Sequence, residues 1–259
     1  MIIAGGVGRL VAPQLCDVLM IMLILVGCGE IQEVPAAGDC LPGDAPLFPL
    51  AVGNWWIYRV TDNQSGQTLP CKANVVVGVE PTDAGPVFEI EKRDMKSNTS
   101  WLLDTGTKLV WLRKRWGEPG AYTFDFYDPF LLRLDYRDEY LCSPGTRYSD
   151  MHEERRAVGP DCAQAALPNP GECPAITENV TLRWTVIGTR ECTVRGLAKT
   201  CYCVNRQGDP KEPLGDFCFA RGIGKVSEKA DQTEELVDYC VDGAACPDPP
   251  APIEPGGCK

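Results

Sequence analysis

The sequence predicts an all-β fold, an antiparallel curled sheet or open barrel that is stapled by disulfides. Three observations predict it. Short segments of alternating polarity, rich in β-branched and aromatic residues, recur at 55–60, 73–80 and 86–93. Turn-forming Gly, Pro and Asp separate these segments, and strong capped helices are missing. Cysteines are spread along most of the chain.

The later segments continue the strand pattern. Residues 99–114 predict a hairpin, with Asp104-Thr105-Gly106 as its turn, because Gly106 can adopt positive φ. Further strands are expected at 130–136, 183–194, 200–206 and 216–220. Residues 162–167 and 234–239 are the two candidates for short helices.

The domain organisation is read from composition. We expect one β-rich domain over 48–243, interrupted by a Cys- and Pro-rich loop at 159–178. Cys162 and Cys173 would close that loop locally. Residues 28–47, rich in Gly, Pro and Ala, predict a flexible tether, and 244–259 predict a Pro-rich tail.

The cysteines indicate an oxidising compartment. Twelve cysteines besides Cys28 lie in the 232 residues of 28–259, about 5%, and allow up to six disulfides. Cys201 and Cys203 would point to one face of a strand, too far apart to bridge each other. Antiparallel pairing predicts Cys192–Cys201 and Cys203–Cys218 instead, with Cys192 opposite Cys201. A thiol-exchange centre and a metal site are the alternatives.

The net charge of −11 gives no generic electrostatic reason for nucleic-acid binding. Arg113-Lys114-Arg115 is the densest basic cluster, and we interpret it as a solvated strand edge.

The apolar run Val18–Val26 is too short to span a membrane and has the length of a signal-peptide core. The residues that follow it, Leu25-Val26-Gly27-Cys28, resemble the lipobox of bacterial lipoproteins. The resemblance implies that residues 1–27 are a lipoprotein signal peptide and that Cys28 is lipidated, with palmitate among the expected acyl chains. Several acyl chains anchor a protein stably to a membrane.

Phe48-Pro49-Leu50 followed by Gly53-Asn54-Trp55-Trp56-Ile57-Tyr58 resembles the opening of a group of uncharacterised bacterial envelope lipoproteins, "F/Y-P-L…G-N-x-W-x-Y". Residues 192–204 and 219–226 match the same group, although Arg195-Gly196-Leu197 stands where relatives carry Pro-Ala-Gly. The resemblance implies a β-rich curled sheet or open barrel and brings no catalytic residues.

Residues suited to catalysis are scarce. His152 is the single histidine and lies in a charged stretch, which predicts an exposed, charge-paired side chain. Carboxylates are plentiful, but nothing selects a pair of the kind that glycosidases use. Asp125, Asp128, Asp135 and Asp138 do not match a calcium loop. We therefore expect no catalytic residue, no metal and no cofactor.

Trp55 and Trp56 are adjacent, so in a strand they face opposite sides. One is expected to fill the core, while the other is a possible ligand-face aromatic.

Three functions remain in competition. The first is a non-enzymatic β-domain that is anchored by lipid in the bacterial envelope and binds a small ligand or an envelope protein. We expect the outer membrane, since Gly29 is not the Asp that retains some lipoproteins at the inner membrane. The second is a structural or assembly protein that acts through protein contacts. The third is a carboxylate-pair hydrolase. A cavity would favour the first and a flat apolar patch the second.

Overall fold

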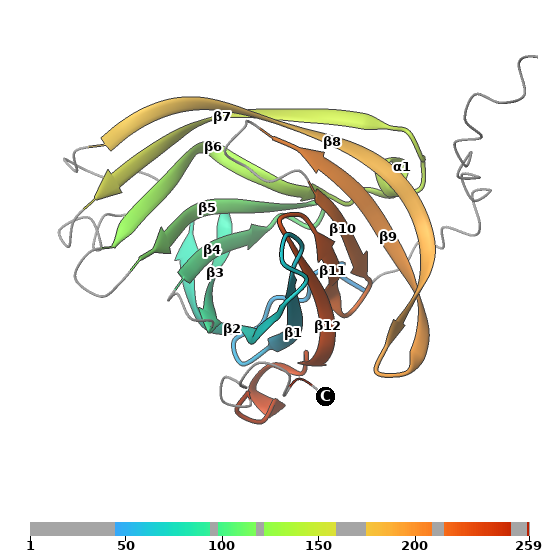
Figure 1. The fold of residues 1–259 in the computed structure, drawn as a ribbon. Coiled ribbons are helices and arrows are strands. Elements are labelled where there is room, and N and C mark those ends of the chain that lie inside the picture. Colours follow the sequence, from blue (N-terminus) through green and yellow to red (C-terminus); the bar gives the residue numbers. More distant parts are fainter. Residues whose placement is uncertain are drawn as a thin grey trace, which may run out of the picture. The chain divides into compact units, whose positions relative to one another are not determined.

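A computed structural model describes residues 45–93, 98–117, 122–158, 175–208, 215–249 and 258. Within them, twelve strands form one antiparallel sheet in chain order (Figure 1). The all-β prediction is confirmed, and the sheet closes into a barrel because the last strand pairs with the first over Trp55–Asp62. The strands are β1 (Trp55–Asp62), β2 (Thr68–Thr82), β3 (Gly85–Arg93), β4 (Asn98–Asp104), β5 (Lys108–Trp116), β6 (Thr123–Asp135), β7 (Arg147–Val158), β8 (Ala175–Val194), β9 (Leu197–Gln207), β10 (Gly215–Ala220), β11 (Gly224–Lys229) and β12 (Gln232–Cys240).

Two short helical turns accompany the strands, α1 (Asp138–Leu141) and the 3-10 turn η2 (Gly243–Ala245). The helix expected at 234–239 is wrong, because these residues lie within β12. Their alternation of buried and exposed side chains has a period of two, and pairing with β1 and β11 overrides the local preference. No helix among the described residues is long and apolar enough to cross a membrane.

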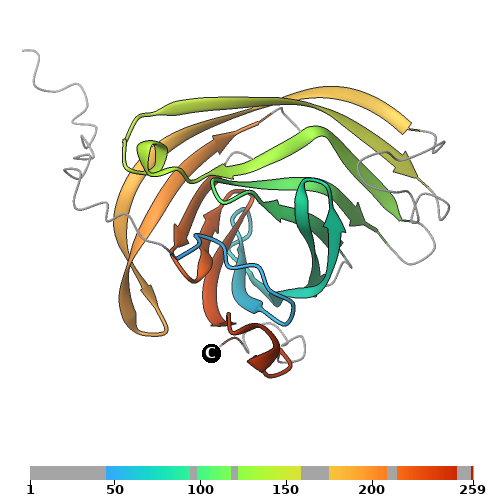
Figure 2. The same ribbon diagram turned by 180° about the vertical axis from the view of Figure 1, so that it is seen from behind.

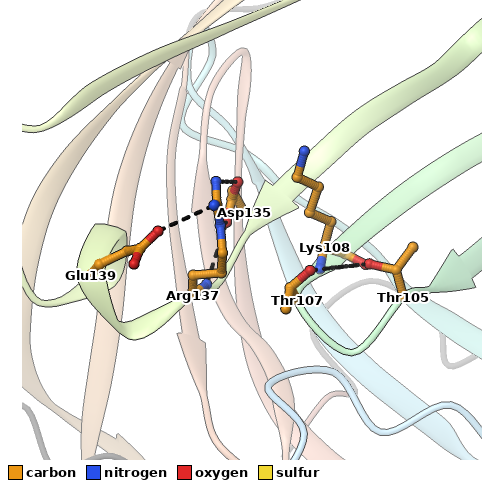
Figure 3. Close-up of polar contacts among 6 residues, drawn as sticks. All are labelled: Thr105, Thr107, Lys108, Asp135, Arg137 and Glu139. Carbon is orange, nitrogen blue, oxygen red and sulfur yellow. Dashed lines mark hydrogen bonds and ion pairs between the residues drawn. The ribbon is translucent and has the colours of Figure 1, made fainter.

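The predicted 99–114 hairpin is confirmed as β4 and β5, and its turn is fixed by side chains (Figure 3). The carboxylate of Asp104 accepts the backbone N–H of Gly106 at 2.7 Å, and Gly106 has φ +84°. The hydroxyl of Thr105 accepts the N–H of Lys108 at 3.0 Å. These local bonds hold the chain reversal. Tyr136 of the main core adds to them, because its hydroxyl donates to the carboxylate of Asp104 and its N–H donates to the carbonyl of Thr107 at 2.9 Å.

The up-and-down order gives the barrel two rims. Odd-numbered strands all run one way and even-numbered strands the other, because every neighbouring pair is antiparallel. The turns that follow β2, β4, β8 and β10, together with α1, lie at one end, here called the covered rim. The ends of β3, β5, β9 and β11 lie at the opposite end, here called the far rim.

The segment Ala45–Leu50 lies across the covered rim, and Figure 2 shows it in blue before β1. Leu47 is fully buried in the main core, as is Leu141 of α1. The N–H of Gly222, in the β10–β11 turn, donates to the carbonyl of Pro46 at 2.9 Å. In the same region Arg137 pairs with Asp135 at 2.8 Å and with Glu139 at 3.1 Å (Figure 3). Apolar side chains and ion pairs therefore close this end.

The residues of the opening motif mostly serve this architecture. Gly53 has φ +98°, and a Cβ there would lie 2.5 Å from the carbonyl oxygen of Gly243. The buried Asn54 donates to the carbonyl of Pro49 at 2.9 Å and accepts the N–H of Gly243 at 2.7 Å. The motif thus ties the segment before β1 to η2.

Trp55 and Trp56 face opposite sides of β1, as predicted. Trp56 is fully buried in the main core, where its ring packs 4.8 Å from that of Phe48. Trp55 is buried on the outer face in a second cluster with Cys71 and Cys258, and its indole N–H donates to the carbonyl of Pro247 at 2.9 Å. The C-terminal segment covers Trp55.

Disulfides join Cys192 to Cys201 and Cys203 to Cys218, the two pairs expected from the strand pattern. Cys203 and Cys218 are directly opposed, with Cα atoms 4.2 Å apart. The expected register of the first pair is wrong, because Cys192 lies opposite Lys199 and bridges diagonally over a Cα distance of 5.9 Å. Within the described residues, Cys71–Cys258 and Cys240–Cys246 also form, and Cys142 is disulfide-bonded.

Several predictions lie outside the described residues: the signal peptide, most of the tether, the lipidation of Cys28, and the closure of the 159–178 loop by Cys162 and Cys173.

Candidate functional site

A cavity of about 270 Å³ lies inside the barrel. Side chains from eight strands line it, and Phe48 contributes from the segment at the covered rim. Six of the lining residues are apolar or aromatic, six are basic, and three are other polar or acidic residues. They are Phe48, Ile90, Leu102, Leu109, Trp111 and Phe219; Lys72, Lys92, Lys114, Arg133, Arg206 and Lys225; and Asn74, Ser100 and Glu228.

The two chemical types are partly separated along the barrel axis. Lys92, Lys114 and Arg206 lie within two residues of the ends of β3, β5 and β9, which places them near the far rim. Leu109, near the start of β5, and Phe219, near the end of β10, lie toward the covered rim beside Phe48. Two basic residues also lie toward the covered rim: Arg133, near the end of β6, and Lys225, which is paired with Phe219 in the sheet.

A buried ion-pair network occupies one side of the cavity. The ammonium of Lys225 lies 2.5 Å from Glu228 and 2.6 Å from Glu234, and Lys72 lies 2.5 Å from the other oxygen of Glu234. Burial alone would raise the pKa of Glu234, but the charges of Lys225 and Lys72 outweigh it and lower that pKa to about 2. Burial lowers the pKa of Lys225, and Glu228 and Glu234 more than reverse this, so its pKa is raised. Glu234 and Lys225 are therefore both charged at neutral pH.

Lys92 and Lys114 have no such compensation, because neither makes an ion pair with a carboxylate among the described residues. Arg133 makes no direct ion pair either, but its charge helps to lower the pKa of Glu228. Its guanidinium lies 4.2 Å from the ring centre of Trp111, and the ammonium of Lys92 lies 6.0 Å from the same ring.

The pKa of Lys92 is lowered well below its usual value near 10.5. Burial in the barrel is the largest cause, and the positive charges of Lys72, Lys114 and Arg133 add to it. Glu234 opposes the shift, but it is already engaged by Lys72 and Lys225. Each of these groups reaches Lys92 from a different strand.

The charge of the cavity is opposite to that of the chain. Six basic side chains line it, against Glu228 in the lining and Glu234 in the adjoining network. With all of them ionised the excess is four positive charges, whereas the whole chain carries a net charge of −11. Such an interior favours a negatively charged occupant.

The interpretation of Arg113-Lys114-Arg115 as a solvated edge is wrong. Lys114 lines the cavity, while Arg113 is 8% exposed, with its guanidinium 4.0 Å from the ring centre of Trp101. A β-bulge lies between Trp111 and Arg113 in the pairing with β6, and it moves Lys114 to the inner face. Simple alternation from Trp111 would have pointed Lys114 outward.

Trp55 and Trp56, the possible ligand-face aromatics, do not face the cavity. Neither residue is among those that line the cavity. The aromatic side chains that do line it are Phe48, Trp111 and Phe219. A signal for one basic residue was present in 86–93, where Phe88, Ile90 and Lys92 share a face by alternation, so a lysine continues the apolar face.

The other candidate groups are placed elsewhere. His152 is 2% exposed, so the expected exposed side chain is wrong; its ring packs edge-on against Tyr127 with centres 5.5 Å apart. Asp125 pairs with Arg156 at 2.8 Å, and Asp135 pairs with Arg137. Over the described part of the chain, no group of three or more His, Cys, Asp or Glu side chains is arranged to hold a metal ion.

Comparisons with known proteins give a limited result. No protein-family model and no curated protein matches the chain. Two solved structures resemble it, each at 14% sequence identity. One is a candidate lipoprotein from Parabacteroides distasonis, covering 77% of this chain and 100% of that chain with a TM-score of 0.31. The other is a candidate exported protein with a YmcC-like fold from Bacteroides fragilis, covering 76% and 99% with a TM-score of 0.39.

Proposed function

We propose that this protein is a non-enzymatic ligand-binding barrel of the bacterial cell envelope, held at the outer membrane by a lipid on Cys28. The cavity inside the barrel is the observation that carries the proposal, since convergent polar groups within a partly apolar lining are what small-molecule sites provide. The apolar run, the lipobox-like residues before Cys28 and the disulfides support the location.

The hydrolase alternative is less well supported. It needs a carboxyl group that stays protonated to act as an acid. Lysines lower the pKa values of Glu228 and Glu234, the two carboxylates at the cavity, so neither is suited to donate a proton near neutral pH. Action through protein contacts alone would leave the cavity without a role.

The anchor is tested by the intact mass of protein extracted from membranes of a bacterial host. Loss of residues 1–27 with added acyl mass is expected, and Cys28→Ala should abolish both. An unmodified Cys28 in the wild-type protein would contradict the anchor.

Ligand binding is tested by native mass spectrometry of the same preparation. We expect a bound small molecule that is lost in Ser100→Leu, which fills the cavity, and kept in Thr200→Leu, which alters an exposed position on β9. Near-ultraviolet circular dichroism would establish that both variants are folded. Retention of the molecule in folded Ser100→Leu would place it outside the cavity and contradict the proposal.

A further inference from the structure

The ligand class follows from the cavity, provided that the barrel is a ligand-binding domain. We infer that the cavity binds an amphipathic anion, with the acid group at Lys92 and Lys114 near the far rim and a short apolar body along Trp111 toward Phe48 and Leu109. The shared chemistry is a carboxylate or phosphate monoester on an alkyl or aryl body.

The first argument is the supply of unpaired positive charge. A buried cation without an anion is unfavourable, and buried charges in proteins are normally paired. Lys72 and Lys225 follow that rule through Glu234 and Glu228. Arg133 lies near enough to Glu228 to lower its pKa. Lys92 and Lys114, which line the same cavity, form no ion pair with a carboxylate among the described residues. An anionic ligand would supply the missing charge.

The second argument is the order of side chains along the barrel axis. Lys92 and Lys114 lie near the far rim, whereas Phe48 and Leu109 lie toward the covered rim. The basic residues toward the covered rim are already engaged, Lys225 by Glu228 and Glu234 and Arg133 by the ring of Trp111. The apolar end is closed by the segment Ala45–Leu50, with Phe48 packed on Trp56. A ligand with one acid group and one apolar end matches this order in a single orientation.

The third argument is the position of Trp111. Its ring lies between the acid-binding and apolar ends and is contacted by Arg133 and Lys92. A flat aromatic surface accommodates an apolar body, while the adjoining ammonium of Lys92 remains directed at its acid group. A volume of about 270 Å³ suits a small ligand rather than a complete two-chain lipid.

Binding of an anion should also change the protonation of Lys92. Lys92 has a lowered pKa for reasons of burial and of repulsion by Lys72, Lys114 and Arg133, with Glu234 opposing. An acid group beside it favours the charged ammonium and raises that pKa. Binding should therefore be accompanied by proton uptake at any pH where Lys92 of the unliganded protein is not fully protonated.

The test is isothermal titration calorimetry on the full protein extracted from membranes into lipid nanodiscs, with empty nanodiscs as the blank. The probes are hexanoate, hexyl phosphate, hexan-1-ol and hexyltrimethylammonium, which share one apolar body and differ in the head group. We expect hexanoate or hexyl phosphate to bind at least about 10-fold more tightly than hexan-1-ol, and the cation not to bind. The stronger of the two acids identifies the carboxylate or phosphate source.

Lys92→Met removes one cation from the cavity, and Lys108→Met is the matched control. Lys108 is exposed in the turn at the covered rim, and its side chain points away from its neighbours in Figure 3. We expect Lys92→Met to weaken acid binding about 10-fold and to abolish the linked proton uptake, measured in two buffers of different ionisation heat. Lys108→Met should change neither.

Two results would overturn the inference in different ways. Equal binding of hexan-1-ol and the acids, unchanged in Lys92→Met, would refute the anion while leaving a ligand-binding cavity in place. Binding of none of the four probes, together with no co-purifying molecule lost in Ser100→Leu, would refute the cavity as a ligand site altogether.

Discussion

Glu234 is the residue whose removal should destabilise the barrel most among its charged groups. It is 6% exposed and accepts from Lys72 at 2.5 Å and Lys225 at 2.6 Å. In Glu234→Gln, Lys225 keeps only Glu228, and Lys72 loses its carboxylate. Breaking a buried pair by deleting one partner costs about 3–5 kcal/mol. We expect the free energy of unfolding in urea at pH 7 to fall by that amount, with disulfides intact.

Glu235→Gln is the matched control, one residue further along β12 and on the other face. The side chain of Glu235 is 58% exposed, and its pair with Arg59 spans 3.6 Å. Exposed pairs contribute about 0–1 kcal/mol. If both variants lost the same stability within about 0.5 kcal/mol, the Lys72–Glu234–Lys225 network would not stabilise the barrel as argued.

The pH dependence gives a second check on the same residue. The pKa of Glu234 is lowered to about 2 in the folded protein, while that of an unfolded Glu is about 4.3. Its contribution is therefore fully present above about pH 4.3 and is lost as the pH falls toward 2. The stability difference between wild type and Glu234→Gln should shrink across this window.

Three further predictions concern single features of the barrel. Lys92→Met should raise the thermal midpoint at pH 7 and flatten the rise of stability with pH below about 10.4, because the lowered pKa of Lys92 makes its charge destabilising there; a lower midpoint would contradict this. Gly224→Ala should cost more unfolding free energy than Gly196→Ala, since both have positive φ but only at Gly224 does a Cβ meet the Trp56 indole, at 3.0 Å; equal losses would show that the contact is unimportant. Removing Cys71–Cys258 by paired Ser substitutions should cost about 5 kcal/mol, against about 2 kcal/mol for Cys240–Cys246, because the loops span 187 and 6 residues; the reverse order in urea unfolding would refute the loop-entropy reasoning.

Local pattern was enough to predict the strands and some of their pairing. In the Asp104–Gly106 turn the Asp104 carboxylate accepts from a backbone N–H only two residues away, so nearby residues contain the information. The Cys192–Cys201 disulfide is predicted correctly even though the predicted register of the two strands is wrong. The tight Arg195-Gly196 turn shifts the pairing by two positions, which keeps both cysteines on one face and within bridging distance.

Positions of charged side chains relative to the interior could not be predicted in this way. A bulge in β5 reverses the facing of Lys114, and bulges depend on pairing with strands far away in the sequence. Arg133 interrupts an apolar segment and reaches the cavity only because the sheet closes. The closure requires β1 to pair with β12, at least 170 residues away in the sequence, and no local sequence pattern contains that information.

Substitutions of Ser100 can distinguish effects on the stability of the barrel from effects on the proposed ligand binding. It is 1% exposed, lines the cavity and pairs with Ile90, so it lies diagonally across from Lys92 on the same inner face. Ser100→Asp would place a carboxylate within reach of that lysine and supply internally the charge that we assign to the ligand.

We therefore expect Ser100→Asp to restore the pKa of Lys92 toward its usual value and to retain the stability of the barrel, relative to the isosteric but uncharged Ser100→Asn. The same variant should lose hexanoate binding, whereas Ser100→Asn should keep most of it. Lysine side-chain NMR and calorimetry measure the two effects independently. A binding site for an anion should reject hexanoate when the introduced carboxylate already neutralises Lys92. Undiminished hexanoate binding in Ser100→Asp would therefore mean that the charge of Lys92 does not recognise the acid.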